Sequence, residues 1–161
     1  MPALREALTA DGFRDVATYV QSGNLLVTTR ASADTAAERV GVVIRKRFGL
    51  DITILVRSSD DLAAVVRRNP LAGIATDPRR YLVTFLSEQL PSGVLSDLRS
   101  VSTQETFAVV GREVYTWHPD GIARTPIWER LASRSLGIAA TSRNWQTVTT
   151  LLAMADQDAA R

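Results

Sequence analysis

The stretch Tyr19-Val-Gln-Ser-Gly-Asn-Leu-Leu-Val27 decides the fold of the first half of this chain. Apolar residues lie on both sides of a central Gln-Ser-Gly-Asn segment. Gly23 and Asn24 adopt a positive φ at low cost, and short polar side chains bond readily to their own backbone in turns. Two apolar runs joined by such a segment are typical of a β-hairpin. The sequence therefore predicts strands at about residues 15–21 and 24–29.

The residues around this hairpin predict two helices and a further strand. Residues 2–13 begin with a proline and reach a stop at Gly12, which indicates a helix. Residues 31–48 carry apolar side chains at helical spacing. The short run 51–56 is rich in β-branched residues and predicts a strand. The first half thus has the order helix, strand, strand, helix, strand, and a linking helix from Ser58 to about residue 69 follows it.

Residues 70–79 separate this half from the next, since they contain two prolines and a glycine and show no periodicity. Beyond them a similar order of elements begins again. The predicted elements are a strand at 80–86, a helix at 91–99, a hairpin over 105–117, a helix at 126–136, an extended piece at 138–141, and a helix from Ser142 or Arg143 to about Ala155. This order is close to a ferredoxin-like unit.

The sequence therefore predicts an α+β fold with two ferredoxin-like halves, the first of which lacks its leading strand. We assign residues 1–69 to the first half with its linking helix, 70–79 to a linker, and 80–161 to the second half with its C-terminal helix.

The missing strand has a physical consequence, because in the ferredoxin-like arrangement it lies inside the sheet. Without it, the strands at 24–29 and 52–56 would each lose a neighbour, and unpaired buried backbone groups are costly. We expect either that the natural chain begins upstream of Met1 or that another segment or subunit fills this position.

Composition excludes several classes of function. The 161 residues are 45% hydrophobic and carry a net charge of +2. The absence of cysteine removes disulfides, thiolate metal sites and cysteine nucleophiles. No apolar run is long enough to span a membrane, and the N-terminus has no signal-like segment, so we expect a cytoplasmic protein. Lys46 is the only lysine, and the arginines that dominate the basic residues either reflect nucleotide bias or bind phosphates and carboxylates.

Three motifs in the expected order resemble the family known as domain of unknown function 1697. They are the hairpin Tyr19-Val-Gln-Ser-Gly-Asn24, the pair Asn69-Pro70, and Thr141-Ser-Arg-Asn-Trp-Gln-Thr-Val148. The resemblance covers nearly the whole chain and implies a bacterial cytosolic α+β protein with ferredoxin-like architecture. Members of the family usually open with a strand that ends in an Arg-Gly-x-Asn-Val-Gly-like segment, and this sequence lacks it. The family implies no established reaction.

The hairpin turn is the first candidate binding site. Gln21, Ser22 and Asn24 place three short polar side chains on one turn. Their simplest interpretation is turn geometry with local backbone bonds. The functional interpretation is that the amides of Gln21 and Asn24 bond to a ligand while N–H groups of the turn receive an anion.

The start of the last predicted helix is the second and better candidate. Arg143 and Asn144 lie where a helix N-terminus and a nearby cation would suit an anion, with Thr141 or Ser142 as the cap. The alternative is a cap and a core tryptophan, with Arg143 bridging to a carboxylate of the other half.

We therefore expect a small cytoplasmic binding protein that holds a polar or anionic ligand in the crevice between the halves. The candidate ligand-binding residues are Gln21, Ser22, Asn24, Arg143, Asn144 and, as a weaker addition, Arg80. Two other classes stay open: a nucleic-acid-binding protein with an arginine-rich face, and an enzyme of unassigned reaction. No residue stands out as catalytic, no metal or cofactor is expected, and the only histidine, His118, lies beside a turn where a structural role is expected.

Overall fold

The computed structural model describes residues 1–20, 23–101 and 105–159, and side chains as far as residue 157. Its contacts divide the chain into two compact units. The first unit comprises Met1–Asp61 together with Leu151–Arg161, and the second comprises Leu62–Thr150. The division falls inside two helices, between residues 61 and 62 and between residues 150 and 151. Leu71, which lies in the expected linker 70–79, belongs to the core of the second unit.

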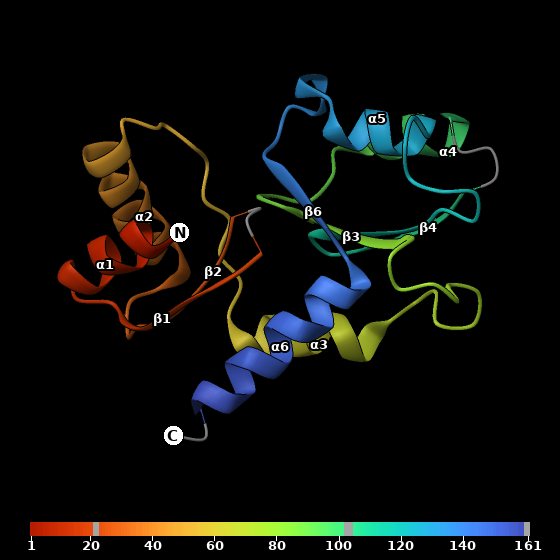
Figure 1. The fold of residues 1–161 in the computed structure, drawn as a ribbon. Helices are drawn as coiled ribbons and strands as arrows, with labels where there is room; N and C mark the ends of the chain where they lie inside the picture. Colours follow the sequence, from red (N-terminus) through yellow and green to blue (C-terminus); the bar gives the residue numbers. More distant parts are fainter. Residues whose placement is uncertain (21–22, 102–104, 160–161) are drawn as a thin grey trace. The chain divides into compact units, whose positions relative to one another are not determined.

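The first unit contains the hairpin and two helices (Figure 1). The order is α1 (Pro2–Ala10), β1 (Arg14–Tyr19), β2 (Asn24–Thr28) and α2 (Ala33–Phe48). The two strands pair antiparallel, with Tyr19 opposite Asn24 and Thr18 opposite Leu25. The predicted hairpin is therefore present. The core of the unit is a cluster on which both helices and both strands pack, built from Leu8, Phe13, Val40, Val43 and Ile44.

Local sequence explains the ends of α2. The Ser32 hydroxyl accepts a hydrogen bond from the Thr35 amide at 3.2 Å, which is a typical N-cap. Gly49 ends the helix at φ +68°, a left-handed conformation that glycine adopts without strain.

The second unit is a complete ferredoxin-like fold. Its sheet contains β3 (Tyr81–Leu86), β4 (Thr106–Val110), β5 (Glu113–Trp117) and β6 (Ala140–Asn144) in the order β4-β5-β3-β6, and every pairing is antiparallel. The central strand β3 is buried at all six positions.

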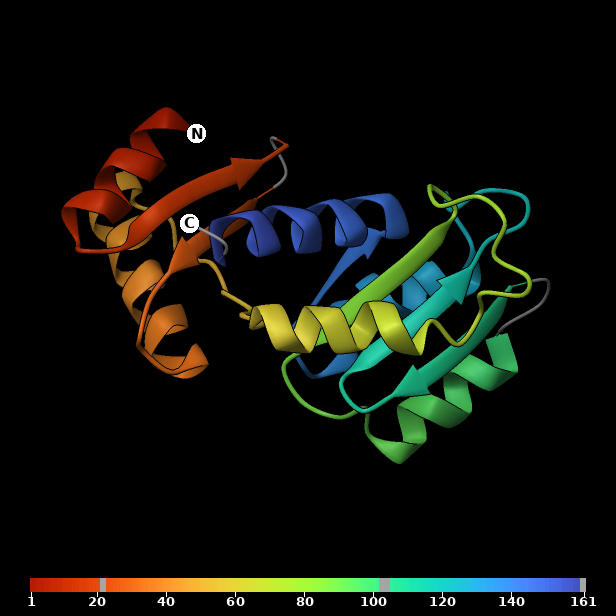
Figure 2. The same cartoon turned by 90° about the horizontal axis from the view of Figure 1, so that it is seen from below.

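Helices cover both faces of this sheet (Figures 1 and 2). The helices α4 (Ser92–Val101) and α5 (Pro126–Ala132) lie on one face, and a short 3-10 helix (Arg134–Leu136) follows α5. The other face is covered by α3 (Ser59–Arg68) and by the start of α6 (Trp145–Ala159). Alternate residues of β3 therefore enter two separate cores, and each fully buried Val, Leu or Phe side chain contributes about 1.5–3 kcal/mol.

Two expectations about the elements are wrong. Residues 51–56 form no strand, because the described structure offers them no neighbouring strand with which to pair. The last helix begins at Trp145 rather than at Ser142 or Arg143, because pairing with β3 extends β6 as far as Asn144.

Among the described residues, no helix combines the length and the apolar character that crossing a membrane requires.

Candidate functional site

Arg143 lies on β6, at one edge of the second unit's sheet. It pairs with Val83 of β3, so its side chain emerges on the face covered by α3 and α6. Its Nη1 donates to Thr141 Oγ1 and to the Ser142 carbonyl, each at 2.7 Å. The side chain is half-buried, and this burial lowers the pKa of the guanidinium below its usual range. An arginine nevertheless stays charged at neutral pH, so β6 carries an oriented and partly desolvated cation.

Asn144 ends β6 and caps α6. Its Oδ1 accepts a hydrogen bond from the Thr147 amide at 2.8 Å, and the Gln146 amide donates to the Pro78 carbonyl at 3.3 Å. The expected cap at Thr141 or Ser142 is therefore wrong. Because first-turn amides of α6 already have protein partners, the helix start offers less to an anion than the sequence suggested.

The hydroxyls of Thr141 and Ser142 have other partners. Thr141 accepts from Arg143, and Ser142 Oγ lies 2.7 Å from Thr84 Oγ1 across the β6–β3 pairing. Thr84 is 1% exposed, so this pair satisfies a hydroxyl inside the sheet.

Arg80 lies just before β3 and has its own partners. Its Nη1 donates to the Pro119 carbonyl at 2.6 Å, and its Nε lies 3.5 Å from Asp77 Oδ2. The side chain is about half exposed. Arg80 therefore ties the start of β3 to the turn after β5.

Asn24 has a structural role in the first unit. It is buried, and its Nδ2 donates to the Tyr19 carbonyl at 3.0 Å, which closes the hairpin. The adjacent Gly23 has φ +80°, as the turn requires. Gln21 and Ser22 lie outside the described residues. Each unit is described by itself, so the expected convergence of Asn24 with Arg143 stays a prediction.

His118 is enclosed in the second unit. It is 1% exposed, with Nε2 at 2.9 Å from Thr116 Oγ1 and Nδ1 at 3.1 Å from Thr125 Oγ1. Burial lowers the pKa of His118 from its usual 6.5, and the charge of Glu105 partly opposes this shift. A neutral imidazole between two hydroxyls agrees with the structural role expected for this residue.

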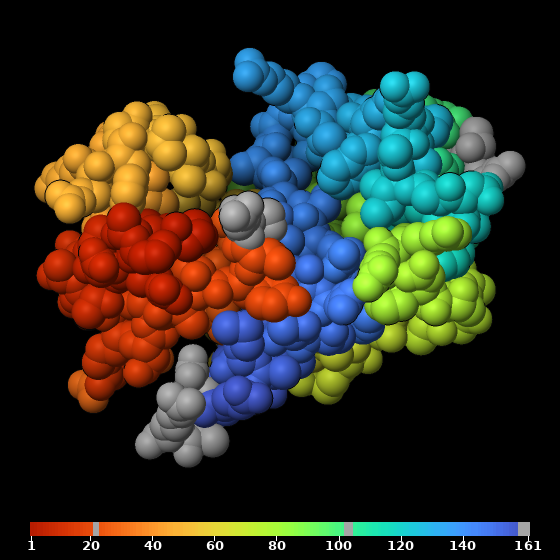
Figure 3. All heavy atoms as spheres, viewed as in Figure 1, coloured from red at the N-terminus to blue at the C-terminus, as the bar shows by residue number. Residues whose placement is uncertain are grey.

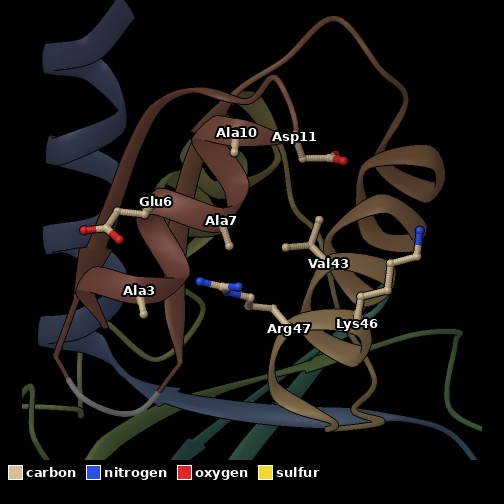
Figure 4. A pocket seen from close by; sticks show the side chains of 8 residues that line it. All are labelled: Ala3, Glu6, Ala7, Ala10, Asp11, Val43, Lys46 and Arg47. Atoms are coloured by element: carbon tan, nitrogen blue, oxygen red, sulfur yellow. The ribbon is translucent and has the colours of Figure 1, made fainter.

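A groove between α1 and α2 was not anticipated from the sequence (Figure 4). It has a volume of about 550 Å³, and α1 contributes Ala3, Glu6, Ala7 and Ala10 to its lining. Arg47 extends between the two helices. The spacing of these alanines on one helix face is the signal that could have indicated it. The charged residues Glu6, Asp11, Lys46 and Arg47 also line the groove.

Aromatic side chains of the second unit pack in its core. Tyr81 stacks on Trp145 with ring centroids 4.8 Å apart, and Tyr115 donates its hydroxyl to the Val65 carbonyl at 3.2 Å. Burial raises the pKa of both tyrosines to about 12. Both rings are buried, so neither is available to stack on a base.

No metal site appears in the part of the chain that the structure describes, where no three His, Asp or Glu residues gather as metal ligands would.

Comparison with known proteins gives a family and a fold. No curated protein matches the chain. The conserved bacterial protein SP0830 from Streptococcus pneumoniae has a similar structure, with a TM-score of 0.77 and 21% sequence identity over 96% of this chain and 88% of that chain. This likeness supports the fold alone. The family model described as protein of unknown function DUF1697 matches residues 1–115, which is well over half of the 161 residues. The chain belongs to the DUF1697 family.

Proposed function

We propose that this protein binds a small anionic ligand, such as a carboxylate or a phosphate ester, with Arg143 as the anchoring cation. One observation carries the proposal: a guanidinium that is partly removed from water and held in place by two short hydrogen bonds from one of its nitrogens. Holding a cation away from water costs free energy, and an anion that binds beside it offsets this cost.

The orientation of Arg143 favours recognition of a planar or tetrahedral anion. Two hydrogen bonds of Arg143 use Nη1, and their acceptors are neutral oxygens of the neighbouring residues Thr141 and Ser142. The planar fork is therefore oriented before any ligand arrives, which reduces the entropy lost on binding. Its position on a paired strand holds the side chain more firmly than a loop would.

The adjoining residues support this arrangement. Trp145 follows the strand and stacks on Tyr81, while Asn144 caps α6. Asn144 and Trp145 are adjacent in the chain, so these two contacts hold the junction between β6 and α6 in place. The proposal keeps the cytoplasmic location expected from the sequence.

The test compares thermal unfolding with and without inorganic phosphate and citrate. A ligand at 100 times its Kd stabilises the folded state by about 2.7 kcal/mol, which raises the Tm measurably. We expect this increase in the wild type, a smaller one in Arg143→Lys, and none in Arg143→Gln.

Arg130→Gln is the matched control. Arg130 is another partly buried arginine of the second unit, with 20% of its side chain exposed, and it pairs with Asp97 at 3.1 Å. This variant should keep the full ligand-induced increase in Tm. If Arg143→Gln lowers the Tm and still responds to the anions as the wild type does, Arg143 is structural and the proposal is wrong.

A further inference from the structure

The strand β4 forms one outer edge of the second unit's sheet. The strand order is β4-β5-β3-β6, so β4 pairs with β5 on one side, and no described strand pairs with its other side. Figure 2 shows β4 as the outermost strand, next to α4. Figure 3 shows the turquoise stretch of the chain, around residues 105–125, on the surface of the second unit. The outer edge of β4 is therefore a surface on which another strand can pair.

The register of β5 shows which backbone groups of β4 point outward. The Leu86 amide of β3 donates to the Arg112 carbonyl at 2.9 Å, so even-numbered residues along β5 bond toward β3. The odd-numbered residues of β5 therefore bond toward β4. Their partners on β4 are the even-numbered residues 106, 108 and 110.

Phe107 and Val109 are the two residues of β4 whose N–H and C=O groups point away from the sheet. No residue in the described part of the chain bonds to these groups. Both side chains are half-buried and pack against the apolar cluster beneath α4 and α5. Unpaired backbone groups beside apolar side chains form a template for a further strand.

β4 lacks the features that usually keep a sheet edge from pairing. Such edges are commonly protected by charged side chains, by proline or by a bulge. β4 reads Thr-Phe-Ala-Val-Val, without a charge or a proline, and its pairing with β5 is regular. At the opposite edge of the same sheet, β6 carries the charged Arg143. The two edges therefore differ, and β4 is the one suited to pairing.

We propose that β4 pairs antiparallel with β4 of a second copy of this chain, about a two-fold axis at Ala108. Pairing through the outward groups places Phe107 opposite Val109 of the second copy and forms about four main-chain hydrogen bonds. The two four-stranded sheets then continue across the axis as one sheet. This interface does not involve Arg143 and is independent of the proposed function.

The side chains of β4 suit this two-fold register. Phe107 meets Val109 of the second copy on the face that α4 and α5 cover, and pairs of an aromatic with a β-branched residue stabilise antiparallel strands. Ala108, the smallest side chain of the strand, lies on the axis and faces its own copy. That position is a non-hydrogen-bonded pair, in which opposite side chains approach most closely.

The charges that flank β4 favour an antiparallel second copy. Glu105 precedes the strand, and Arg112 follows it in the turn to β5. In the antiparallel pairing, the end of one strand that carries Glu105 lies beside the end of the other that carries Arg112, so opposite charges approach each other. A parallel pairing would bring like charges together. Because both copies offer the same outward groups, a two-fold contact satisfies both edges at once.

An introduced cysteine tests the register, because the chain contains no cysteine of its own. In the proposed pairing, the two Ala108 Cα atoms are about 4.5 Å apart, which a disulfide can span. Ala108→Cys should therefore form a covalent dimer under mild oxidation on a non-reducing gel. Val109→Cys is the matched control. The two copies of residue 109 are diagonal neighbours about 7–8 Å apart, beyond the reach of a disulfide, so this variant should stay monomeric.

A second experiment follows the wild type by sedimentation equilibrium and by NMR hydrogen exchange at increasing protein concentration. At ten times the Kd, about four-fifths of the chains are paired, so the amides of Phe107 and Val109 should exchange about fivefold more slowly. The amide of Ser142 on β6 should not change. Val109→Pro removes an outward donor and leaves the bonds to β5 intact, so it should abolish the association that Val109→Ala retains.

Three results would overturn the proposal. The first is a wild type that stays monomeric up to about 1 mM, where a contact with a Kd of that order is already about half populated. The others are equal cross-linking of Ala108→Cys and Val109→Cys, or a dimer that Val109→Pro leaves intact. If the wild type stays monomeric while an apolar peptide of unrelated sequence slows exchange at Phe107 and Val109, another polypeptide pairs with β4 and the proposed occupant is wrong.

Discussion

Protonation of His118 should destabilise the second unit. The ring is 1% exposed and lies between the hydroxyls of Thr116 and Thr125, at 2.9 and 3.1 Å. The Thr125 hydroxyl also donates to the Ile122 carbonyl at 3.2 Å, so it accepts from His118 Nδ1, and Nε2 then accepts from Thr116. This arrangement suits a neutral imidazole. A second proton would place a charge in a buried site and oppose the Thr116 bond.

The sign and size of the pH effect follow from linkage. Burial lowers the pKa of His118 in the folded state below its usual 6.5, although Glu105 opposes this in part. At pH values between the folded and unfolded pKa of His118, the unfolded chain binds more protons than the folded chain. The contribution of neutral His118 to the free energy of unfolding is therefore full above about pH 6.5, and it falls as the pH decreases toward the folded pKa. For a single group such as His118, the free energy of unfolding cannot change by more than about 1.4 kcal/mol per pH unit.

Two features of the chain make this measurable. His118 is the only histidine, so its NMR titration is unambiguous. The three tryptophans, at positions 117, 128 and 145, all belong to the second unit, so urea unfolding followed by fluorescence reports on that unit. The wild type should lose stability relative to His118→Gln as the pH falls below 6.5. A titration midpoint at or above 6.5, or parallel stability curves for the two proteins, would refute the reasoning.

Three further substitutions test the local structure. Ser142→Ala should cost about 1–3 kcal/mol because it leaves the buried Thr84 hydroxyl without its partner, and the double change with Thr84→Val should recover part of this loss in urea unfolding. Asn144→Ala removes the cap of α6 and should cost about 0.5–2 kcal/mol by the same assay; an unchanged midpoint would show that the cap contributes nothing. Gly49→Ala forces a side chain into a left-handed conformation and should lower the Tm of the first unit by circular dichroism, whereas an unchanged Tm would contradict this.

Local sequence patterns were sufficient to predict most of the helices and strands. The Gly23-Asn24 turn defined the hairpin, and helical spacing with Gly49 at the end defined α2, because these signals act over a few residues. Residues 51–56 read as a strand, yet a strand exists only when another strand pairs with it, and no local pattern contains that information.

Prediction of the candidate site was limited in the same way, because local patterns do not contain long-range strand pairing. The sequence indicated the region around Arg143 correctly as the junction of two elements but assigned Arg143 to the helix. Pairing of β6 with β3 over residues 140–144 is a long-range effect, and it moved the helix start and made Asn144 the cap. The enclosure of His118 between Thr116 and Thr125 likewise depends on a contact across a turn that residue spacing does not specify.

The most direct test of the central proposal is NMR of the arginine side chains during titration with inorganic phosphate. The account predicts that the Nε–H signal of Arg143, identified by its loss in Arg143→Lys, shifts in a saturable manner while those of Arg80 and Arg130 stay still. These two arginines pair with Asp77 and Asp97 and serve as internal controls. An unmoved Arg143 signal, or equal and unsaturated shifts of all the arginines, would contradict the proposal that Arg143 anchors an anionic ligand.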